Sequence, residues 1–162
     1  MNVWKTMIHN KKLEQEGIIE VTYPLPATVV EMLSKEDWRS IDQYFLKAEA
    51  TGGLLNEFLK EVLDFDSIEH IIAIRSAPDD EDGIWHDDGS RILGFSLSLT
   101  TDHLSVAGGE LRFRKKGESS GVSLTTRPMG QMLIFKTGIY GFEHMVSAVT
   151  TGKRIVIAGW CS

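Results

Sequence analysis

The sequence has little of three features: cysteine, long apolar runs and positive charge. Cys161 is the only cysteine among 162 residues, so no intrachain disulfide can form and a reducing compartment is expected. No run of 18 apolar residues occurs, and we therefore expect no transmembrane helix and no membrane partner. Acidic residues outnumber basic ones by 23 to 17, which argues against a nucleic-acid backbone as a general partner.

The amino-terminal segment also lacks the continuous apolar core of a signal peptide, so we predict a cytoplasmic protein. A chain of 162 residues is expected to form a single domain with its own hydrophobic core. We divide it into an amino-terminal part, residues 1–66, and a catalytic core, residues 67–162. The first part is expected to contribute a strand and supporting helices.

Helical periodicity is confined to the first part. Residues 1–16 are polar and weakly patterned and are expected to form an arm, as a short strand or helix. A strand is predicted at 17–23, followed by at least one helical turn at 27–33. Ser34 and Asp37 fit the two ends of a capping box, after which apolar residues recur at helical spacing to Ala48. A second apolar stripe runs from Leu54 to Leu63, and both stripes are expected to pack on a sheet.

From Ser67 the period changes to that of strands. Short β segments separated by glycine-rich turns are typical of a double-stranded β-helix, or jelly roll. We therefore predict a mainly β (α+β) fold in which the amino-terminal helices pack on one sheet. Strands are expected at residues 68–75, 84–88, 91–100, 110–114, 122–125, 131–135, 142–149 and 154–160.

Three residues of the core have the composition of a metal site. His86 and Asp88 are two apart, so on a strand their side chains share a face while Asp87 points away. His144 supplies a second imidazole from a distant strand. Two histidines and one carboxylate form a facial triad for ferrous iron that leaves three metal positions open. Each histidine taken alone is more often a packed, hydrogen-bonded residue than a ligand.

A cation follows the third candidate ligand at a fixed offset. Arg154 lies ten residues after His144, at the start of an apolar stretch, and its planar fork suits a dicarboxylic cosubstrate. The alternative is a structural ion pair with Asp or Glu. Strand parity alone leaves open whether His144 and Arg154 face the same cavity, because a shift of one residue in the turn between them would flip the faces.

Together these positions resemble the Fe(II)/2-oxoglutarate-dependent dioxygenases, in particular their prolyl-4-hydroxylase-like branch. That family carries His-x-Asp, later Gly-Gly-Glu-Leu, and then His-x-Val-x-Pro-Val-x-x-Gly-x-Arg with a tryptophan six residues beyond. Ala148 departs from it, since the family usually has proline there. The matching residues are His86, Asp88, Gly108-Gly109-Glu110-Leu111, His144, Val146, Val149, Gly152, Arg154 and Trp160.

The resemblance implies a function and a division of roles. Iron would be held by His86, Asp88 and His144, and Arg154 would bind the distal carboxylate of 2-oxoglutarate, helped by Ser98 or Thr100. Dioxygen would be the other cosubstrate, ascorbate the reductant, and succinate and CO2 the by-products of hydroxylation. The substrate stays open between a protein side chain such as proline and a small molecule.

Two other classes compete with this interpretation. One is a cupin-type metal enzyme that uses no cosubstrate, and the other is a jelly-roll binding module without catalysis. Arg154 argues against the first, because such a site has no need of a carboxylate partner. The four acids at 79–82 are interpreted as a solvated loop, or alternatively as a surface that attracts a basic substrate.

Overall fold

A computed structural model of the chain describes residues 3–162, with side chains from residue 9 onward. Met1 and Asn2, where the segment searched for a signal peptide begins, lie outside the described residues. The polar segment expected to form an arm is a helix, so the strand alternative was wrong. The helices are α1 (Val3–Glu16), α2 (Ala27–Ser34), α3 (Trp38–Glu49) and α4 (Leu54–Lys60), with a short 3₁₀ turn, η1 (His103–Ser105).

Within residues 3–162, ten strands form three antiparallel sheets. A five-stranded sheet has the order β1-β7-β3-β10-β2, a three-stranded sheet has the order β6-β5-β8, and β4 pairs with β9. The strands are β1 (Ile18–Thr22), β2 (Ile68–Ser76), β3 (Leu93–Ser98), β4 (Ala107–Gly108), β5 (Leu111–Arg114), β6 (Val122–Leu124), β7 (Gln131–Lys136), β8 (Glu143–Val146), β9 (Val149–Thr151) and β10 (Lys153–Cys161).

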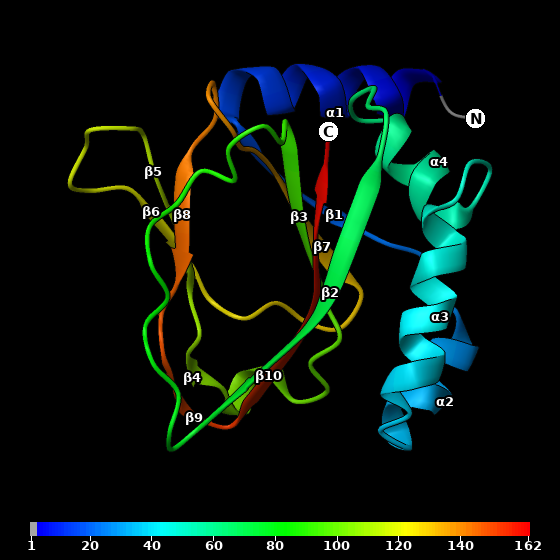
Figure 1. Ribbon diagram of the computed structural model, residues 1–162, viewed down its shortest axis with the longest axis vertical. Coiled ribbons are helices and arrows are strands. Elements are labelled where there is room, and N and C mark those ends of the chain that lie inside the picture. The colour runs from blue at the N-terminus through cyan, green and yellow to red at the C-terminus, as the bar shows by residue number, and fades with distance from the viewer. Residues whose placement is uncertain (1–2) are drawn as a thin grey trace.

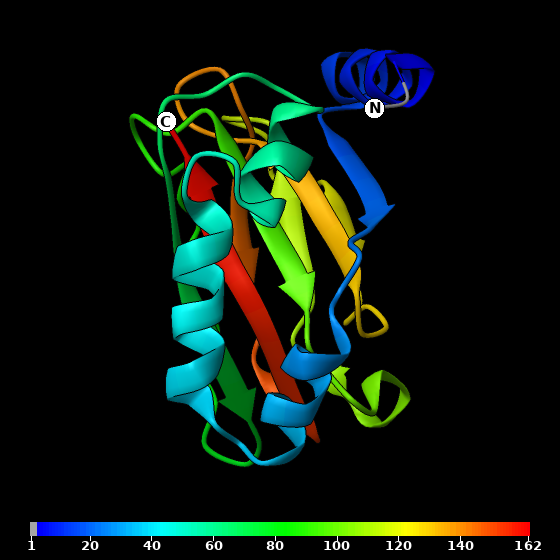
Figure 2. The ribbon, with the colours of Figure 1, turned by 90° about the vertical axis from the view of Figure 1, so that its right-hand side faces the viewer.

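The sheets and helices are stacked in layers. Helices α2, α3 and α4 stand on one side of the five-stranded sheet and the three-stranded sheet faces its other side, while α1 lies across one end (Figure 1). The view turned by 90° shows α3 running along the face of that sheet (Figure 2). This is the predicted jelly roll with its helices packed on one sheet. Among the described residues, none of the helices is both long and apolar enough to cross a membrane.

Strand alternation explains how the large sheet serves both layers. On β10, Ile155 and Ile157 belong to the helix-side core, so Arg154 and Val156, which alternate with them, face the smaller sheet. On β3, the leucines and Phe95 likewise face the helices, which turns Ser96 and Ser98 inward. The cavity side of the central strands is therefore where the polar side chains are placed.

The helix stripes pack as predicted, but one cap was misplaced. Ile41 and Phe45 of α3 are fully buried against the sheet. The N-cap of α3 is Asp37, whose carboxylate accepts the Ser40 N–H at 3.1 Å. Ser34 instead ends α2, and its hydroxyl donates to the Glu31 carbonyl. The predicted capping box therefore began three residues too early.

Two predicted strands also differ from the structure. Residues 84–88 form no strand, since only His86 makes an isolated bridge, to His144. Asp88 has a positive φ of 63°, which is incompatible with extended backbone. The segment 142–149 is divided into β8 and β9, because Ser147 and Ala148 leave the ladder to bond with residues of neighbouring loops.

Candidate metal centre and anion cavity

The two histidines are held together by their own backbone. The His86 N–H donates to the His144 carbonyl at 3.1 Å, and the His144 N–H donates back to His86 at 2.9 Å. Their rings lie side by side, with centroids 4.4 Å apart. The loop residue is thereby fixed to β8, although 58 residues separate the pair in the sequence.

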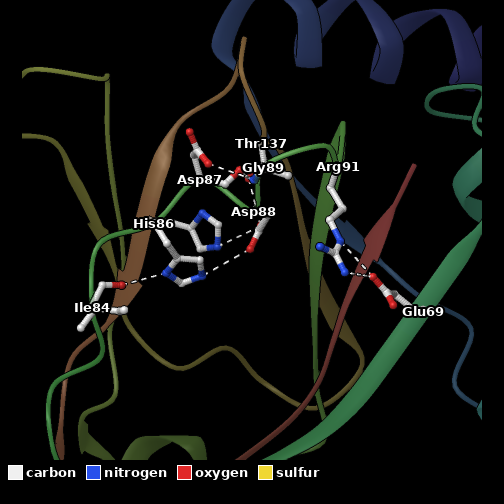
Figure 3. A network of polar contacts seen from close by, with 9 residues as sticks. Glu69, Ile84, His86, Asp87, Asp88, Gly89, Arg91 and Thr137 are labelled. Atoms are coloured by element: carbon white, nitrogen blue, oxygen red, sulfur yellow. Dashed lines mark hydrogen bonds and ion pairs between the residues drawn. The ribbon is translucent and has the colours of Figure 1, made fainter.

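Asp88 completes the cluster from a turn. Its carboxylate oxygens lie 3.3 Å from Nε2 of His86 and 3.3 Å from Nε2 of His144. Figure 3 shows Asp88 beside His86. The three ligand atoms all lie within 4.8 Å of one another. The left-handed backbone at Asp88, and not strand alternation, aims this carboxylate at the imidazoles. The reason given for choosing Asp88 was therefore wrong, although the structure brings together the three residues that were named.

Asp87 faces elsewhere. Its carboxylate pairs with Lys116 Nζ at 2.7 Å and accepts the Gly89 N–H at 2.9 Å. Thr137 ties the two aspartates together, because its hydroxyl lies 2.8 Å from the Asp87 carbonyl and 3.0 Å from the Asp88 carboxylate. Figure 3 shows Thr137 beside both residues. This hydroxyl fixes the orientation of the candidate ligand, and nothing in the sequence pattern had indicated it.

The pKa shifts of Asp88 and His144 suit a metal. Burial disfavours the Asp88 carboxylate, but the His86 hydrogen bond and the nearby histidines outweigh it, and the pKa of Asp88 is lowered. Burial lowers the pKa of His144, which keeps its ring neutral. Hydrogen bonding to Asp88 raises the pKa of His86. The Nδ1 of His86 lies 2.8 Å from the Ile84 carbonyl, so in the neutral ring the proton resides there and Nε2 is free to bind.

These residues fit a facial triad. Ligand atoms bound at about 2.1 Å to an octahedral ion lie roughly 3 Å apart, close to the spacing of the Asp88 oxygens from the two Nε2 atoms. Two imidazoles and one carboxylate are the donor set of non-haem Fe(II) oxygenases. His86, Asp88 and His144 could therefore hold Fe(II).

A cavity between the sheets begins at the histidines. This outer chamber, about 240 Å³ in volume, reaches from His86 and His144 to Arg154 and is walled mostly by apolar side chains. An inner chamber of about 10 Å³ continues it. Arg154, Ser96, Leu111 and Val156 line both chambers, so Arg154 lies where they meet. His144 and Arg154 therefore face one cavity, which parity had left open.

Arg154 is a buried cation that lacks an anion. Only 5% of the residue is exposed, and no hydrogen bond or ion pair reaches its guanidinium from residues 9–162. Burial, together with the nearby Arg75, lowers the pKa of Arg154 to about 10. Arg75 is the direct cross-strand partner of Arg154 on β2. The charge of Arg75 is compensated by Asp80, whose carboxylate oxygen lies 3.0 Å from Nε of Arg75. The alternative of a structural ion pair for Arg154 thus finds no partner among the described residues, and the remaining charge is suited to an anionic ligand.

The two predicted helpers differ in position. Ser98 lines the inner chamber, but its hydroxyl donates to the Arg127 carbonyl at 2.7 Å. The Thr100 hydroxyl bonds both the carbonyl and the N–H of Ile155, each at 3.0 Å. Thr100 lines neither chamber. Its proposed contact with a cosubstrate stays a prediction that this geometry does not favour.

The acidic run anchors a loop more than it serves as a solvated surface. Asp80 accepts the Val149 N–H at 2.7 Å, and Asp82 accepts the Ala148 N–H at 2.7 Å. Ala148 stands where the resembled family usually has proline, and proline would lack the N–H that Asp82 uses. Two of the four acids are thus engaged in holding the loop before His86 against the segment after His144.

Three residues outside the cluster have structural surroundings. His70 is buried between Glu49 and Asp42. Trp85 stacks under Arg114 with 4.2 Å between the ring centroid and the guanidinium carbon. Cys161 is fully buried, which raises the pKa of its thiol to about 12 and keeps it protonated.

Comparisons with known proteins agree with this geometry. The sequence model described as the 2OG-Fe(II) oxygenase superfamily matches residues 75–162, which include the three candidate ligands and Arg154. No curated protein sequence matches the chain significantly. A prolyl-4-hydroxylase from Pseudomonas putida superposes with a TM-score of 0.68 at 20% identity, covering 96% of this chain and 93% of that one.

Two further solved structures share the fold. A prolyl hydroxylase from Trichoplax adhaerens, in complex with a peptide fragment of the hypoxia inducible factor oxygen degradation domain, has a TM-score of 0.68 at 12% identity and covers 99% and 90% of the chains. A 2OG-Fe(II) oxygenase family protein from Burkholderia pseudomallei has a TM-score of 0.62 at 12% identity and covers 97% and 90%.

Proposed function

Because the chain belongs to the 2OG-Fe(II) oxygenase superfamily, we propose that it hydroxylates a substrate C–H with conversion of 2-oxoglutarate and dioxygen to succinate and CO2. The observation that carries the proposal is the unpaired guanidinium of Arg154 inside a cavity that begins at the histidine–aspartate cluster. A cupin-type metal site would leave this buried charge unexplained, since it has no use for a dicarboxylate.

The roles of the side chains follow from their positions. Bound Fe(II) would supply the redox chemistry with dioxygen. His86, Asp88 and His144 would hold the ion, with Thr137 orienting the aspartate. Arg154 would bind the distal carboxylate and so direct the keto acid end of the cosubstrate toward the ion. The apolar walls exclude water, which strengthens that ion pair.

The substrate belongs to one of two classes, a protein side chain or a small molecule. A peptidyl substrate such as proline is the proposal that the prolyl hydroxylase neighbours favour, one of which holds a peptide. Almost half of the His86 side chain is exposed, which supports access of such a substrate to the site from outside the protein. We further propose one catalytic domain, with residues 1–66 supporting 67–162, in a cytoplasmic setting whose reducing conditions favour ferrous iron.

The test is turnover of the cosubstrate. Purified protein with Fe(II) and ascorbate is expected to convert 2-oxoglutarate to succinate, slowly alone and faster with substrate. His144→Ala should abolish conversion and metal binding together. Arg154→Ala should keep the metal and weaken 2-oxoglutarate binding about 10- to 100-fold, the contribution of hydrogen bonds to a charged group. If the wild-type protein binds the metal but neither binds nor converts 2-oxoglutarate, the cupin-type alternative is favoured. If it binds neither the metal nor 2-oxoglutarate, a non-catalytic binding module is favoured.

A further inference from the structure

The strand at one end of the five-stranded sheet has a free backbone edge. β2 is the outermost strand on that side (Figure 1). Just beyond its ladder with β10, Ser67 and Ser162 exchange backbone hydrogen bonds at 3.1 and 3.0 Å. Antiparallel pairs alternate between hydrogen-bonded and non-hydrogen-bonded positions. The odd-numbered residues of β2 therefore bond to β10, whereas the N–H and C=O groups of His70, Ile72 and Ile74 point away from it.

This edge is uncovered. No backbone hydrogen bond reaches His70, Ile72 or Ile74 from the other described residues. Only 1% of the His70 side chain is exposed, although the residue as a whole is partly exposed, so its exposed part is the backbone. A free edge can pair with another chain, and natural proteins protect such edges with proline, lysine or a bulge. The nine residues of β2 pair in regular register and include none of these.

Exposed apolar side chains lie on both faces of this edge. Ile71, which lines the outer chamber, is 50% exposed, and Ile74, on the helix face, is 41% exposed. Leu46 of α3 is 55% exposed. It lies one helical turn from Asp42, whose carboxylate is 3.2 Å from the ring of His70 on β2. Apolar side chains gathered around a free strand favour a protein partner.

The residues of β2 are complementary to a second copy of the same strand. Two copies can pair antiparallel with Ile72 on the twofold axis, which is the self-complementary arrangement of a symmetric dimer. The opposed residues of the two copies are then His70 and Ile74, Ile71 and Ala73, and Glu69 and Arg75. The last pair joins opposite charges, and the first two cover the exposed isoleucines. About six backbone hydrogen bonds can form, because each hydrogen-bonded pair exchanges two.

We propose that the protein forms a homodimer in which two β2 strands pair about Ile72 and join the two five-stranded sheets into one. The proposal is independent of the proposed function, because it uses neither the metal cluster nor Arg154. The twofold axis of antiparallel strands is perpendicular to the sheet, so both helical layers lie on one side and both cavities on the other.

The first test is the mass in solution. Sedimentation of the purified protein is expected to give about 36 kDa, twice the 18.1 kDa of the chain. Ile74→Pro should weaken dimerisation about 10- to 100-fold, because each copy loses an edge donor. The fold should survive, since this N–H faces outward. Ile74→Thr keeps the N–H and should stay dimeric. Wild type that remains at 18.1 kDa up to about 100 μM would overturn the proposal.

A second test fixes the register and does not depend on proline. Non-hydrogen-bonded pairs bring their Cα atoms to about 4.5 Å, which is within disulfide range. The Ile71→Cys/Ala73→Cys protein should therefore become a covalent dimer on mild oxidation. Ile139→Cys, at an exposed isoleucine of the loop before β8, should stay monomeric on a denaturing gel.

A third test addresses the charges. Glu69→Lys should weaken dimerisation about 5- to 30-fold, because lysine would oppose Arg75 of the second copy. The control is Glu20→Lys, on the strand at the opposite edge of the sheet, with unchanged dimerisation expected. A dimer that neither forms the disulfide nor weakens with Glu69→Lys would use another surface, and the assignment of β2 would be overturned.

Discussion

At the scale of single residues, the cluster depends on backbone conformations that side-chain spacing does not reveal. Asp88 reaches both imidazoles because its φ is 63°, a conformation that Asp and Asn tolerate better than most residues. The adjacent Asp87 is engaged with Lys116 at the surface. Two neighbouring carboxylates thus have different partners, and the difference can be measured.

Asp88→Asn is expected to lower metal affinity by more than about 100-fold, since even partners of metal ligands typically contribute 10- to 100-fold. Asparagine retains the shape and the left-handed backbone, so the fold should survive. Asp87→Asn should change affinity by no more than about fivefold, the value of a half-exposed ion pair. Titration of Fe(II) or Mn(II) into both variants measures these affinities. Equal losses of metal affinity would contradict the assignment of Asp88 as the ligand.

Gly109 makes a second residue-scale prediction. Alanine there would bring its Cβ within 3.0 Å of Arg154 and 2.8 Å of Val149, in a backbone with φ of 64°. We expect at least about tenfold weaker 2-oxoglutarate binding with unchanged metal affinity, because the arginine must shift. The control is Gly117→Ala, which has the same left-handed strain but no atom within 4 Å. Weakened cosubstrate binding in both variants would point to general strain and not to displacement of Arg154.

At the scale of elements, the loop that carries His86 is held by side chains on both sides. The Asp80 carboxylate pairs with Arg75 of β2 and also accepts the N–H of Val149 in β9. The loop, β2 and β9 therefore meet at this one carboxylate. Burial opposes ionisation of Asp80, but these hydrogen bonds outweigh it and lower its pKa below the ordinary 3.8. A group with a lowered pKa stabilises the folded protein above that ordinary value.

Asp80→Asn is expected to destabilise the protein by about 1.5–3 kcal/mol at neutral pH, the contribution of hydrogen bonds to a charged group. The difference from wild type should be complete above about pH 4 and should shrink as the pH falls through the lowered pKa, because both proteins are then uncharged at this position. Denaturant unfolding at several pH values measures it. Asp79→Asn, at an exposed position of the same loop, is the control. If the free energies of unfolding of wild type and Asp80→Asn still differed by the same amount at pH 2, the role of the charge would be contradicted.

The sequence predicted elements better than it predicted their ends. Alternation on β3 is visible in the residues themselves, since Leu93, Phe95 and Leu97 alternate with glycine and serine. The turn at Asp88 and the break at Ser147 depend on hydrogen bonds to distant segments, which no local pattern encodes.

At the scale of the whole molecule, the two layers differ in chemistry. The helix side of the large sheet is an apolar core, and the other side encloses a cavity with an uncompensated cation. The free protein is therefore less stable than its packing alone would allow, and an anion that enters the cavity relieves the cost. We therefore expect ligand binding and stability to be coupled through Arg154.

Saturating 2-oxoglutarate, at about 100 times its Kd, is expected to add about 2.7 kcal/mol to the stability of the Mn(II)-loaded protein, or roughly 5–10 °C in Tm. Arg154→Met should melt at a higher temperature than wild type without ligand, since an unpaired buried charge is removed. The same variant should show no shift with 2-oxoglutarate. Thermal melts with and without ligand test both, and a destabilised Arg154→Met protein would show that the charge has a structural partner.

The paired backbone hydrogen bonds between His86 and His144 have a consequence for hydrogen exchange. Each histidine protects the amide of the other, so neither amide can exchange with deuterium unless the single bridge between the loop and β8 opens. We expect the two amides to exchange at the same opening free energy, and bound metal to slow both by the same factor. Mass spectrometry of the peptides around these positions would measure the motion that releases the ion. The time for which the protein retains iron would then be set by local opening of one bridge.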